Sequence, residues 1–571
     1  MNWTSRSGRD WALRTVADGT VTELAEELDL LPTSARVFAA RGHSRGSMGA
    51  FLNPSLSHLH DPGLLHGAEA AIARIEAALS AAERIRLVTD YDVDGTTSCL
   101  ILHAALDRRI AQRQSGAEIS YHIPDRFTEG YGLSIQAVER AATEGVRLLI
   151  TADIGVRDHV SVRRARELGV DVLICDHHLP PGEDVPADAI AVVCPPQRGC
   201  AYPNKALAAC GVSLKLASAL LADDPRRDEV LSSMLKLAAI GTVADVVDLS
   251  TAENRAIVTL GIRAMNQGKN SPGLGALLQV SGIRPGTVST SDLGFRLGPR
   301  INAAGRLKDA NAVVRLIRER DQQRALDLAS LLDSLNRQRQ GIQEHLVKIV
   351  LAQVADAGPL AEFVVAAGPE TEGWHRGVVG IAASKVRDQL HRPVAVVSVL
   401  GNSATGSIRS VPKVHAVKAL DAAADLLLRY GGHAAAAGFS LESRHLPALA
   451  ERLADFVRTH HEDAACRERE EVDAWSDAAR VPVRLADELA AMEPCGKGNP
   501  VARLAFAGKP ERPRIIKDKH LFFRCGSLEA VWWGEAARRA ELEGVTTVFG
   551  SLSRDDWDGR AQVKLVVEDV A

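Results

Sequence analysis

The sequence predicts a multidomain α/β protein with a parallel main sheet, and three observations support this fold class. The chain has 571 residues, which suggests about three to five domains at ~100–200 residues each. Short apolar runs at residues 85–89, 146–151, 170–175 and 190–193 alternate with helical stretches, a pattern typical of parallel sheets covered by helices. With 46% hydrophobic and 25% charged residues, the composition is that of a folded globular protein.

The same patterns divide the chain into five expected parts. These are an N-terminal helical and irregular segment (1–60), a first α/β domain (61–265), a helical region ending in a connector helix (266–357), a second α/β domain (358–468) and a small β-barrel of OB type (469–571). A connector helix of about 30 residues would span about 45 Å, because an α-helix rises 1.5 Å per residue. A core helix that frays at Gly341 is the alternative.

The net charge and the cysteine content exclude some classes of protein. The formal net charge of −4 excludes a uniformly basic coat for nucleic acid, so a polyanionic partner must meet a local basic patch. The 8 cysteines form no C-x-x-C pair, which favours reduced thiols over a disulfide framework. We find neither a secretory leader nor an apolar stretch of about 18 residues, and therefore expect a cytoplasmic protein without a membrane span.

Acidic and histidine side chains follow several of the apolar runs. Asp90, Asp92 and Asp94 come directly after the run at 85–89, and Asp153 follows the next one. The triplet Asp176-His177-His178 follows the third run, and Asp245 and Asp248 lie in the segment GTVADVVDL. Open α/β sheets bind ligands at the carboxyl ends of their strands. We therefore expect four loops to bring these side chains to one sheet edge.

Such a cluster requires cations. Two unit charges 4 Å apart repel by about 4 kcal/mol at an effective dielectric constant of 20. Carboxylate and imidazole ligands without a thiolate favour Mn²⁺ or Mg²⁺ over structural zinc. Two such ions about 3.5–4 Å apart activate water and stabilise the in-line displacement of a phosphate ester. For any single Asp the alternative is an ordinary helix N-cap, but that does not explain five of them together.

Two other motifs compete for the segment at 90–98. An EF-hand loop starting at Asp90 would place Ile101 where the bidentate Glu belongs, and the segment follows a strand rather than a helix. The string DVDGT also resembles the nucleophile loop of haloacid-dehalogenase-type phosphatases, in which Asp92 would form a phospho-aspartate. That family leaves the Asp176-His177-His178 triplet unexplained, so we keep it as a minor alternative.

In this order, DYDVDG, Asp153, the DHH triplet and GTVADVVDL resemble the four motifs of the DHH phosphoesterase superfamily. Further segments resemble the RecJ family of single-strand-specific 5′→3′ DNA exonucleases over nearly the whole chain. They are PDRFTEGYGL (124–133), PRINAAGRL (299–307), WHRGVVGI (374–381), GSIRS (406–410), GGHAAAAGFS (431–440) and PCGKGNP (494–500). The DHH triplet alone would be weak evidence for the family, whereas the ordered set of ten motifs is highly specific.

The resemblance implies roles for the acidic cluster. Asp94, Asp153, His177 and Asp245 would hold one ion, and Asp153 would bridge to a second ion shared with Asp92. Asp90 belongs beside that second ion, and we group it with His178 as a catalytic residue. His178 would lie beside the scissile phosphate as a polariser or proton donor. We expect Asp248 to be only a helix-end or loop residue.

Basic and glycine-rich motifs are the candidate phosphate-binding groups. We expect Arg126, Arg300 and Arg306 in loops or at helix starts, where guanidinium groups grip phosphate oxygens; ordinary surface ion pairs are the alternative. The complete expected set is Arg126, Arg300, Asn302, Arg306, Ser407, Arg409, Ser410, Gly431, Gly432 and His433. Gly431 could also merely cap a helix predicted over 419–430. The resemblance implies that this second, DHH-associated domain closes a narrow channel over the active site and recognises a 5′ end.

The predicted barrel carries a local basic patch. Residues 501–525 contain seven Lys or Arg and two acids, a local net charge of +5. The adjacent pairs Phe522-Phe523 and Trp532-Trp533 lie close by, and we expect one ring of each pair in the core and the other toward a strand. Basic grooves with stacking rings bind single strands without sequence preference.

The leading hypothesis is a metal-dependent 5′→3′ exonuclease that degrades single-stranded DNA to mononucleotides in DNA repair and recombination. It would use two Mn²⁺ or Mg²⁺ ions, with a single-strand-binding protein and a helicase as candidate partners. One alternative is a DHH phosphodiesterase for short oligonucleotides or cyclic dinucleotides. The other is a non-catalytic single-strand-binding scaffold.

Overall fold

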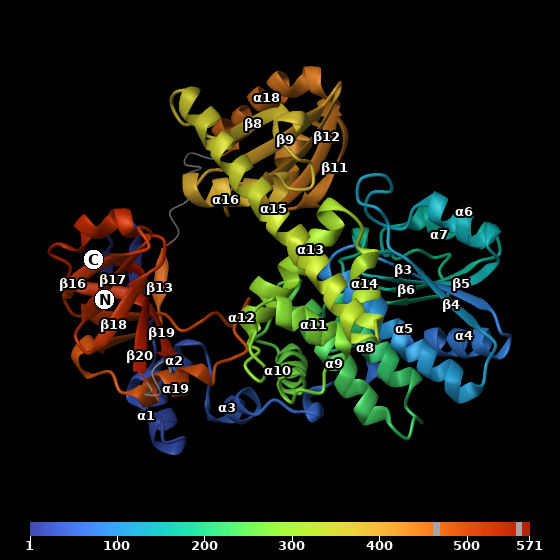
Figure 1. The fold of residues 1–571 in the computed structure, drawn as a ribbon, viewed down its shortest axis with the longest axis horizontal. Coiled ribbons are helices and arrows are strands. Elements are labelled where there is room, and N and C mark those ends of the chain that lie inside the picture. Colours follow the sequence, from blue (N-terminus) through green and yellow to red (C-terminus); the bar gives the residue numbers. More distant parts are fainter. Residues whose placement is uncertain (461–468, 556–561) are drawn as a thin grey trace. The chain divides into compact units, whose positions relative to one another are not determined.

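The structure is a computed structural model that describes residues 1–460, 469–555 and 562–571 (Figure 1). It divides into two units. Unit 1 comprises Met1–Gly305, Asp309–Ser330 and Arg469–Ala571, and unit 2 comprises Arg306–Lys308 and Leu331–Glu468. The expected boundary at residue 468 and Cys466 lie outside the described residues, and the division into five parts stays a prediction.

A parallel five-stranded sheet is the centre of the first α/β domain, as predicted. In the order β4-β3-β5-β6-β7, its strands are Glu118–His122, Arg84–Thr89, Val146–Ala152, Asp171–Cys175 and Ala191–Val193. Four of them match the apolar runs. The fifth, β4, was not predicted, because it is a half-exposed edge strand with polar residues among its five and therefore shows no apolar run.

Helices cover both faces of this sheet (Figure 1). On one face lie α4, α5 and α8, at Ala68–Ser80, Val93–Arg113 and Ala209–Leu220. On the other lie α6 and α7, at Ile135–Thr143 and His159–Glu167. Both layers are apolar against the sheet, which explains why β3, β5 and β6 are almost continuous hydrophobic runs.

An all-helical region continues the layer of helices formed by α4, α5 and α8. Its members are α9 (Arg227–Ala244), α10 (Ala252–Asn266), α11 (Pro272–Val280), α12 (Thr290–Asp292), a π-helix η4 (Leu293–Leu297), α13 (Gly298–Leu307) and α14 (Asn311–Arg318). The long α15 (Gln322–Asp356) has 35 residues, runs through Gly341 and crosses the boundary between the units. At 1.5 Å per residue it is about 50 Å long. It is the predicted connector helix, and it does not end at Gly341.

Unit 2 is a second α/β layer structure around a mixed sheet of order β11-β12-β10-β9-β8. The strands are Leu427–His433, Ala436–Glu442, Ser403–Arg409, Val394–Leu400 and Val364–Pro369. One face packs on α15 and α16 (Val379–Leu390), and the other on α17 (Ala416–Asp421) and α18 (Leu446–His460). The helix expected over 419–430 is wrong, because α17 ends at Asp421 and the chain continues as edge strand β11.

The C-terminal part of unit 1 is a β-barrel-type domain, as predicted. Its sheet has the order β14-β15-β19-β20-β18-β17-β16. These strands are Ala474–Asp477, Leu504–Ala507, Thr547–Asp555, Gln562–Val570, Leu528–Trp532, His520–Cys525 and Pro510–Ile516, with α19 at Val483–Ala490.

The N-terminal segment packs on this barrel rather than standing alone. Its elements are β1 (Asn2–Thr4), β2 (Asp10–Leu13), α1 (Asp18–Glu27), α2 (Pro32–Ala40) and α3 (Arg45–Leu52). Strand β2 pairs with β13 (Glu470–Val472), and Phe38 and Met48 share the apolar core of the barrel. Arg255 of α10 donates to the carbonyls of Phe51 and Met492, which ties the segment and the barrel to the first α/β domain. Among the described residues, no helix is long and apolar enough to cross a membrane.

Candidate metal centre at the sheet edge

Three carboxylates follow β3, as predicted. The side chain of Asp92 caps the N-terminus of α5 by accepting a hydrogen bond from the Gly95 N–H at 3.0 Å. Asp94 is buried in the first turn and accepts hydrogen bonds from the backbone N–H groups of Ala209 and Cys210, at 2.7 and 2.8 Å. The first turn of α8 thus holds the carboxylate where the helix dipole favours negative charge. A Cβ at Gly95 would lie 2.3 Å from the Asp90 carbonyl oxygen, so this turn requires glycine.

Asp153 and the histidines follow β5 and β6. Asp153 is buried with a left-handed φ of 64°, and its N–H donates to the Cys175 carbonyl at 3.1 Å. Asp176 accepts hydrogen bonds at Oδ1 from the N–H groups of His177 and His178, at 2.7 and 3.1 Å. The same oxygen lies 2.8 Å from the His178 Nδ1. Asp176 therefore fixes the direction of both histidine side chains.

Asp245 reaches the cluster from a different kind of element. It is the C-cap of α9, and its N–H donates to the Gly241 carbonyl at 2.9 Å. The segment GTVADVVDL thus spans the end of a helix, whereas Asp90, Asp153 and Asp176 follow strands. Asp248 is a loop residue, as expected: its Oδ1 accepts the Ser250 N–H at 2.8 Å.

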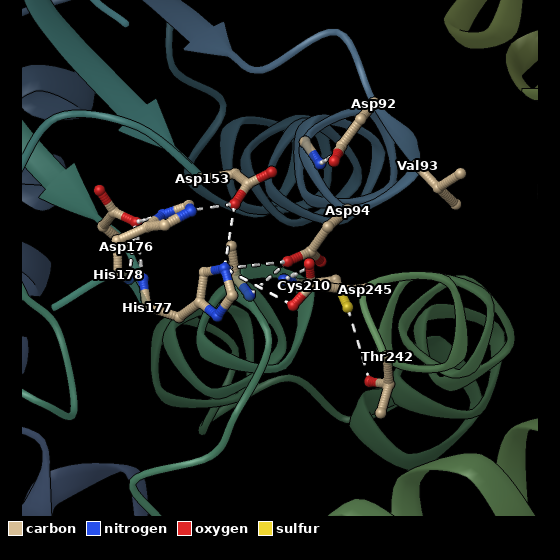
Figure 2. A network of polar contacts seen from close by, with 12 residues as sticks. Asp92, Val93, Asp94, Asp153, Asp176, His177, His178, Cys210, Thr242 and Asp245 are labelled. Carbon is tan, nitrogen blue, oxygen red and sulfur yellow. Dashed lines mark hydrogen bonds and ion pairs between the residues drawn. The ribbon is translucent and has the colours of Figure 1, made fainter. Parts of the chain in front are cut away.

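The predicted ligands converge on His177 (Figure 2). Its Nε2 lies 3.3 Å from an Asp153 oxygen, 3.7 Å from an Asp245 oxygen and 3.8 Å from an Asp94 oxygen. Three groups have donor atoms within 4.8 Å of one another: Asp94–His177–Asp245, Asp153–His177–His178 and Asp90–Asp92–Asp153. Asp153 belongs to two of them, which is the position expected of a bridging ligand.

Burial and mutual repulsion dominate the electrostatics. Burial, strengthened by the charge of Asp92, raises the pKa of Asp90 and of Asp153 well above the usual range of a carboxyl. Burial and the charge of Asp94 raise the pKa of Asp245 to about 8. Asp176 behaves oppositely: burial raises its pKa, but the hydrogen bond and charge of His178 outweigh that effect and lower it. Asp176 therefore stays an ionised acceptor.

The donor set fits hard divalent cations. Asp90 Oδ1 and His177 Nε2 are buried without a hydrogen-bond partner, which leaves both atoms able to bind an ion. The neighbouring Cys210 thiol donates to the Ala238 carbonyl, and burial raises its pKa well above the usual range, so it stays protonated. The available ligands are therefore carboxylate oxygens and imidazole nitrogens, the set that suits Mn²⁺ and Mg²⁺.

Sequence reasoning missed three supporting residues. Asp176 received no role of its own in the sequence analysis, although an acidic residue directly before two histidines is well placed to orient their rings by hydrogen bonds. The Tyr131 hydroxyl donates to the Asp153 carbonyl at 3.2 Å and lies 3.4 Å from the His178 Nε2. Asp158 accepts the Leu133 N–H at 2.8 Å and so anchors the loop that carries Tyr131. No sequence pattern predicts the contacts of Tyr131 and Asp158, because they join separate loops.

The predicted phosphate-binding residues of unit 1 lie near helix α13 and the loop after β4. Arg126 lies in that loop, with its guanidinium over the Tyr91 ring. Arg300 and Asn302 are half-buried in α13, and Arg300 donates to the Arg296 carbonyl at 2.8 Å. Arg306 belongs to unit 2 and donates to the Gly377 carbonyl at 3.3 Å. It lies in the last turn of α13, so its expected place at a loop or helix start is wrong.

In unit 2, Ser407 and Arg409 lie on β10. Arg409 donates to the hydroxyl oxygens of Ser407 at 2.7 Å and Ser384 at 3.1 Å, while the Ser410 hydroxyl donates to the Val414 carbonyl. A Cβ at Gly380 would come within 3.0 Å of the Arg409 guanidinium.

Gly431, Gly432 and His433 form the end of edge strand β11 and are exposed. Gly432 has a φ of 150°, and a Cβ there would lie 2.3 Å from the Ala436 carbonyl oxygen. The glycine is thus required by a close backbone approach within the β11–β12 hairpin. Gly431 lies within the same strand and does not cap a helix.

The barrel carries the expected basic and aromatic surface. Phe523 and Trp532 are buried, whereas Phe522 is half-buried and Trp533 is 55% exposed, so one ring of each pair faces outward as predicted. Trp533 contacts the rings of His520 and Phe522, with centroids at 4.8 and 5.9 Å. We call six residues of this surface the barrel face: Arg512, Arg514, His520, Phe522, Arg524 and Trp533.

Comparison with known proteins agrees with this architecture. Residues 84–242 match the DHH family, N-terminal domain; residues 359–459 match the DHHA1 domain; and residues 472–569 match the RecJ OB domain. A single-stranded-DNA-specific exonuclease RecJ from Bacillus subtilis is 33% identical over 98% of this chain and 70% of its own length. The same-named protein of Dickeya dadantii is 37% identical over 88% of this chain and 87% of its own.

Solved structures agree as well. RecJ from Thermus thermophilus in complex with Mn²⁺ superposes with a TM-score of 0.80 at 31% identity, covering 98% of this chain and 79% of that one. Its complex with Mg²⁺ gives a TM-score of 0.75 at 29% identity, covering 98% and 78%. With three family domains in order and relatives above 30% identity across most of both chains, the chain belongs to the RecJ family of single-stranded-DNA-specific exonucleases.

Proposed function

We propose that the chain is a metal-dependent exonuclease that degrades single-stranded DNA from its 5′ end to mononucleotides. The observation that carries this proposal is the convergence of Asp94, Asp153 and Asp245 on His177, at the ligand-binding edge of a parallel sheet, in a member of the RecJ family. Buried carboxylates that repel one another need divalent cations, and phosphodiester hydrolysis is the chemistry that such cations serve.

The proposed ligand sets follow the geometry. Asp94, Asp153, His177 and Asp245 would hold one ion, and Asp92 and Asp153 would hold the other, with Asp90 beside it. The bound ions would activate water and neutralise charge on the phosphate. Because Asp176 is an ionised acceptor, the His178 Nδ1 carries the proton between them and its Nε2 faces outward toward Tyr131. Burial lowers the pKa of His178, but the hydrogen bond and charge of Asp176 outweigh that effect and raise it, which favours an imidazolium with a second proton on Nε2. We therefore assign proton donation to the Nε2 of this protonated ring.

Substrate binding is proposed for three places. Arg126, Arg300 and Asn302 in unit 1, and Arg306, Ser407, Arg409, Ser410, Gly431, Gly432 and His433 in unit 2, supply donors for phosphate oxygens. The barrel face supplies exposed cations and rings, which is the chemistry of sequence-independent single-strand binding. A surface of this kind is superfluous for a dinucleotide, which argues against the small-substrate alternative.

Partners and location are part of the proposal. An exonuclease for single strands needs a strand whose end has been separated from its complement, which a helicase generates and a single-strand-binding protein keeps open. We propose both as partners, and we propose a cytoplasmic role in repair and recombination.

The test uses single strands labelled at the 5′ or the 3′ end, with Mn²⁺. We expect early release of labelled mononucleotide from the 5′-labelled strand and progressive shortening of the 3′-labelled strand. Internal fragments, release that begins at the 3′ end, or preferred turnover of a dinucleotide would contradict the proposal. Tight binding without cleavage would support a scaffold instead.

A further inference from the structure

The guanidinium of Arg126 lies over the aromatic ring of Tyr91, with Cζ 4.2 Å from the ring centroid. Tyr91 stands between Asp90 and Asp92, so the contact places the cation next to the segment that carries these two residues of the proposed metal centre.

Among the described residues, Arg126 has no carboxylate partner, in contrast to two other arginines near this sheet. Arg108 and Arg109 of α5 bind carboxylates at 2.6 and 2.7 Å. Within the part of the chain that the structure describes, Arg126 makes no ion pair, and its Nε is buried without a hydrogen-bond partner. A guanidinium has five N–H donors, and a buried donor that stays unpaired costs free energy. The Tyr91 ring contacts the group, and the unpaired Nε is a donor that an anionic oxygen could accept from.

The backbone on either side of Arg126 is fixed by a separate set of hydrogen bonds. Glu129 accepts the Asp125 N–H at 3.0 Å, and its other carboxylate oxygen lies 2.7 Å from the His122 Nε2 at the end of β4. Asp125 in turn accepts the N–H groups of Phe127 and Thr128 at 2.8 and 2.9 Å. We call the contacts among His122, Asp125 and Glu129 the loop clasp. The clasp therefore holds the backbone beside Arg126, and the ring contacts its side chain.

We propose that Tyr91 and the loop clasp are positioning elements that present the Arg126 guanidinium, edge first, to a phosphate oxygen of the bound strand next to the metal centre. This inference rests on the proposed function, because it needs a strand bound at that centre. It assigns Tyr91, which lies between two proposed ligands, to substrate orientation rather than to metal binding. Lysine could not replace Arg126, because an ammonium lacks both the planar stack and the fork of donors.

The test is a double-mutant cycle read as KM and kcat for a labelled single strand with Mn²⁺. We expect Tyr91→Leu to raise KM about tenfold, the size of a desolvated cation–π contact, with kcat changed less than about twofold. Tyr91→Phe keeps the ring and should retain the wild-type KM. If Tyr91 acts through Arg126, Tyr91→Leu combined with Arg126→Gln should be no worse than Arg126→Gln alone.

Controls separate positioning from loss of structure. Mn²⁺ stoichiometry from calorimetry and the melting temperature should be unchanged in Tyr91→Leu. If that variant fails to fold, Glu129→Gln replaces it: loosening the clasp should raise KM about threefold, and this effect should vanish in the Arg126→Gln background. Arg315→Gln removes an exposed arginine of α14 and is the matched control for loss of one positive charge.

Several results would overturn the inference. Multiplicative effects of Tyr91→Leu and Arg126→Gln would show that the two side chains act independently. A lower kcat at unchanged KM would assign Tyr91 to the metal centre instead. If wild-type protein degrades strands but Arg126→Gln leaves KM unchanged, the positioning inference fails while the exonuclease stands. If wild-type protein degrades no strand, the proposed function itself fails.

Discussion

The proposed metal centre and the barrel face are both proposed to contact a charged substrate, but they are built in opposite ways. At the metal centre, Asp90, Asp94 and Asp153 are buried side by side, and helix ends and strand ends hold them there. On the barrel face, Arg524 and Trp533 are exposed, and Arg514 is 61% exposed beside Glu529. Burial strengthens electrostatic interactions and makes geometry decisive, whereas exposed charges are screened by water and salt. Loss of one buried ligand should therefore stop the reaction, while loss of one exposed group should only weaken binding.

The largest expected effect is removal of the divalent ions. Dialysis against a chelator should abolish cleavage, because the cluster then holds mutually repelling or protonated carboxyls, and added Mn²⁺ or Mg²⁺ should restore it. The measurement is release of labelled nucleotide before and after metal addition. Single-strand affinity at the barrel face should change much less, as measured by fluorescence anisotropy. Cleavage that persists after chelation would break the comparison.

Single ligand substitutions come next. Asp153→Ala and His177→Ala should each lower kcat by at least about a thousandfold, because each removes a donor that no neighbouring side chain can replace. Asp248→Ala is the matched control, an acid of the same chain region outside the cluster, and should retain near-wild-type turnover. Circular dichroism should confirm that all three variants are folded. Comparable activity in Asp153→Ala and Asp248→Ala would contradict the ligand assignment.

Substitution of the residue behind the histidines should be milder. Asp176→Asn keeps the shape of the side chain but loses its negative charge, and with it part of its capacity to accept the three hydrogen bonds from His177 and His178. We expect kcat/KM to fall about 10–100-fold, the range found when a residue that orients a metal ligand is substituted. The Mn²⁺ affinity measured by calorimetry should fall as well. Wild-type kinetics would mean that the two histidines need no orienting carboxylate.

The barrel face should give the smallest effects on turnover. Trp533→Ala should weaken single-strand binding about fivefold or more, since stacking contributes about 1–3 kcal/mol per base. Its melting temperature should not change, because the ring is 55% exposed. Phe523→Ala is the counterpart on the buried side and should lower stability by about 3–5 kcal/mol. If Trp533→Ala destabilises the fold instead, the outward ring is structural.

Salt dependence separates the two regions further. Arg514→Gln and Arg524→Gln should each reduce the slope of log affinity against log salt by about one, because each removes one phosphate contact. The slope is measured with a strand at several salt concentrations in the absence of divalent ions. An unchanged slope in both variants would remove the barrel face from the binding path.

Much of the site could be predicted because its ligands follow recognisable local patterns. Three runs of apolar residues end in Asp90, Asp153 and Asp176, and the parallel order of β3, β5 and β6 brings those ends together. Asp245 follows a helix instead, and only its motif indicates that it belongs with the ligands at the strand ends. β11 was taken for a helix because the Ala- and Leu-rich stretch at 419–430 favours helix locally, and sheet pairing with β12 overrides that preference.

Residue types and their spacing were enough to predict the α/β class, the ordered motifs, the hard-ligand metal chemistry and the basic, aromatic barrel. Each of these features is encoded within one segment of the chain. Three other features emerged only from the folded protein: the N-terminal segment packs on the barrel, α8 holds Asp94 by its N–H groups, and Arg126 lies on Tyr91. Each of these contacts joins residues that are distant in sequence. They depend on the tertiary packing of separate helices, strands and loops, which no local sequence pattern specifies.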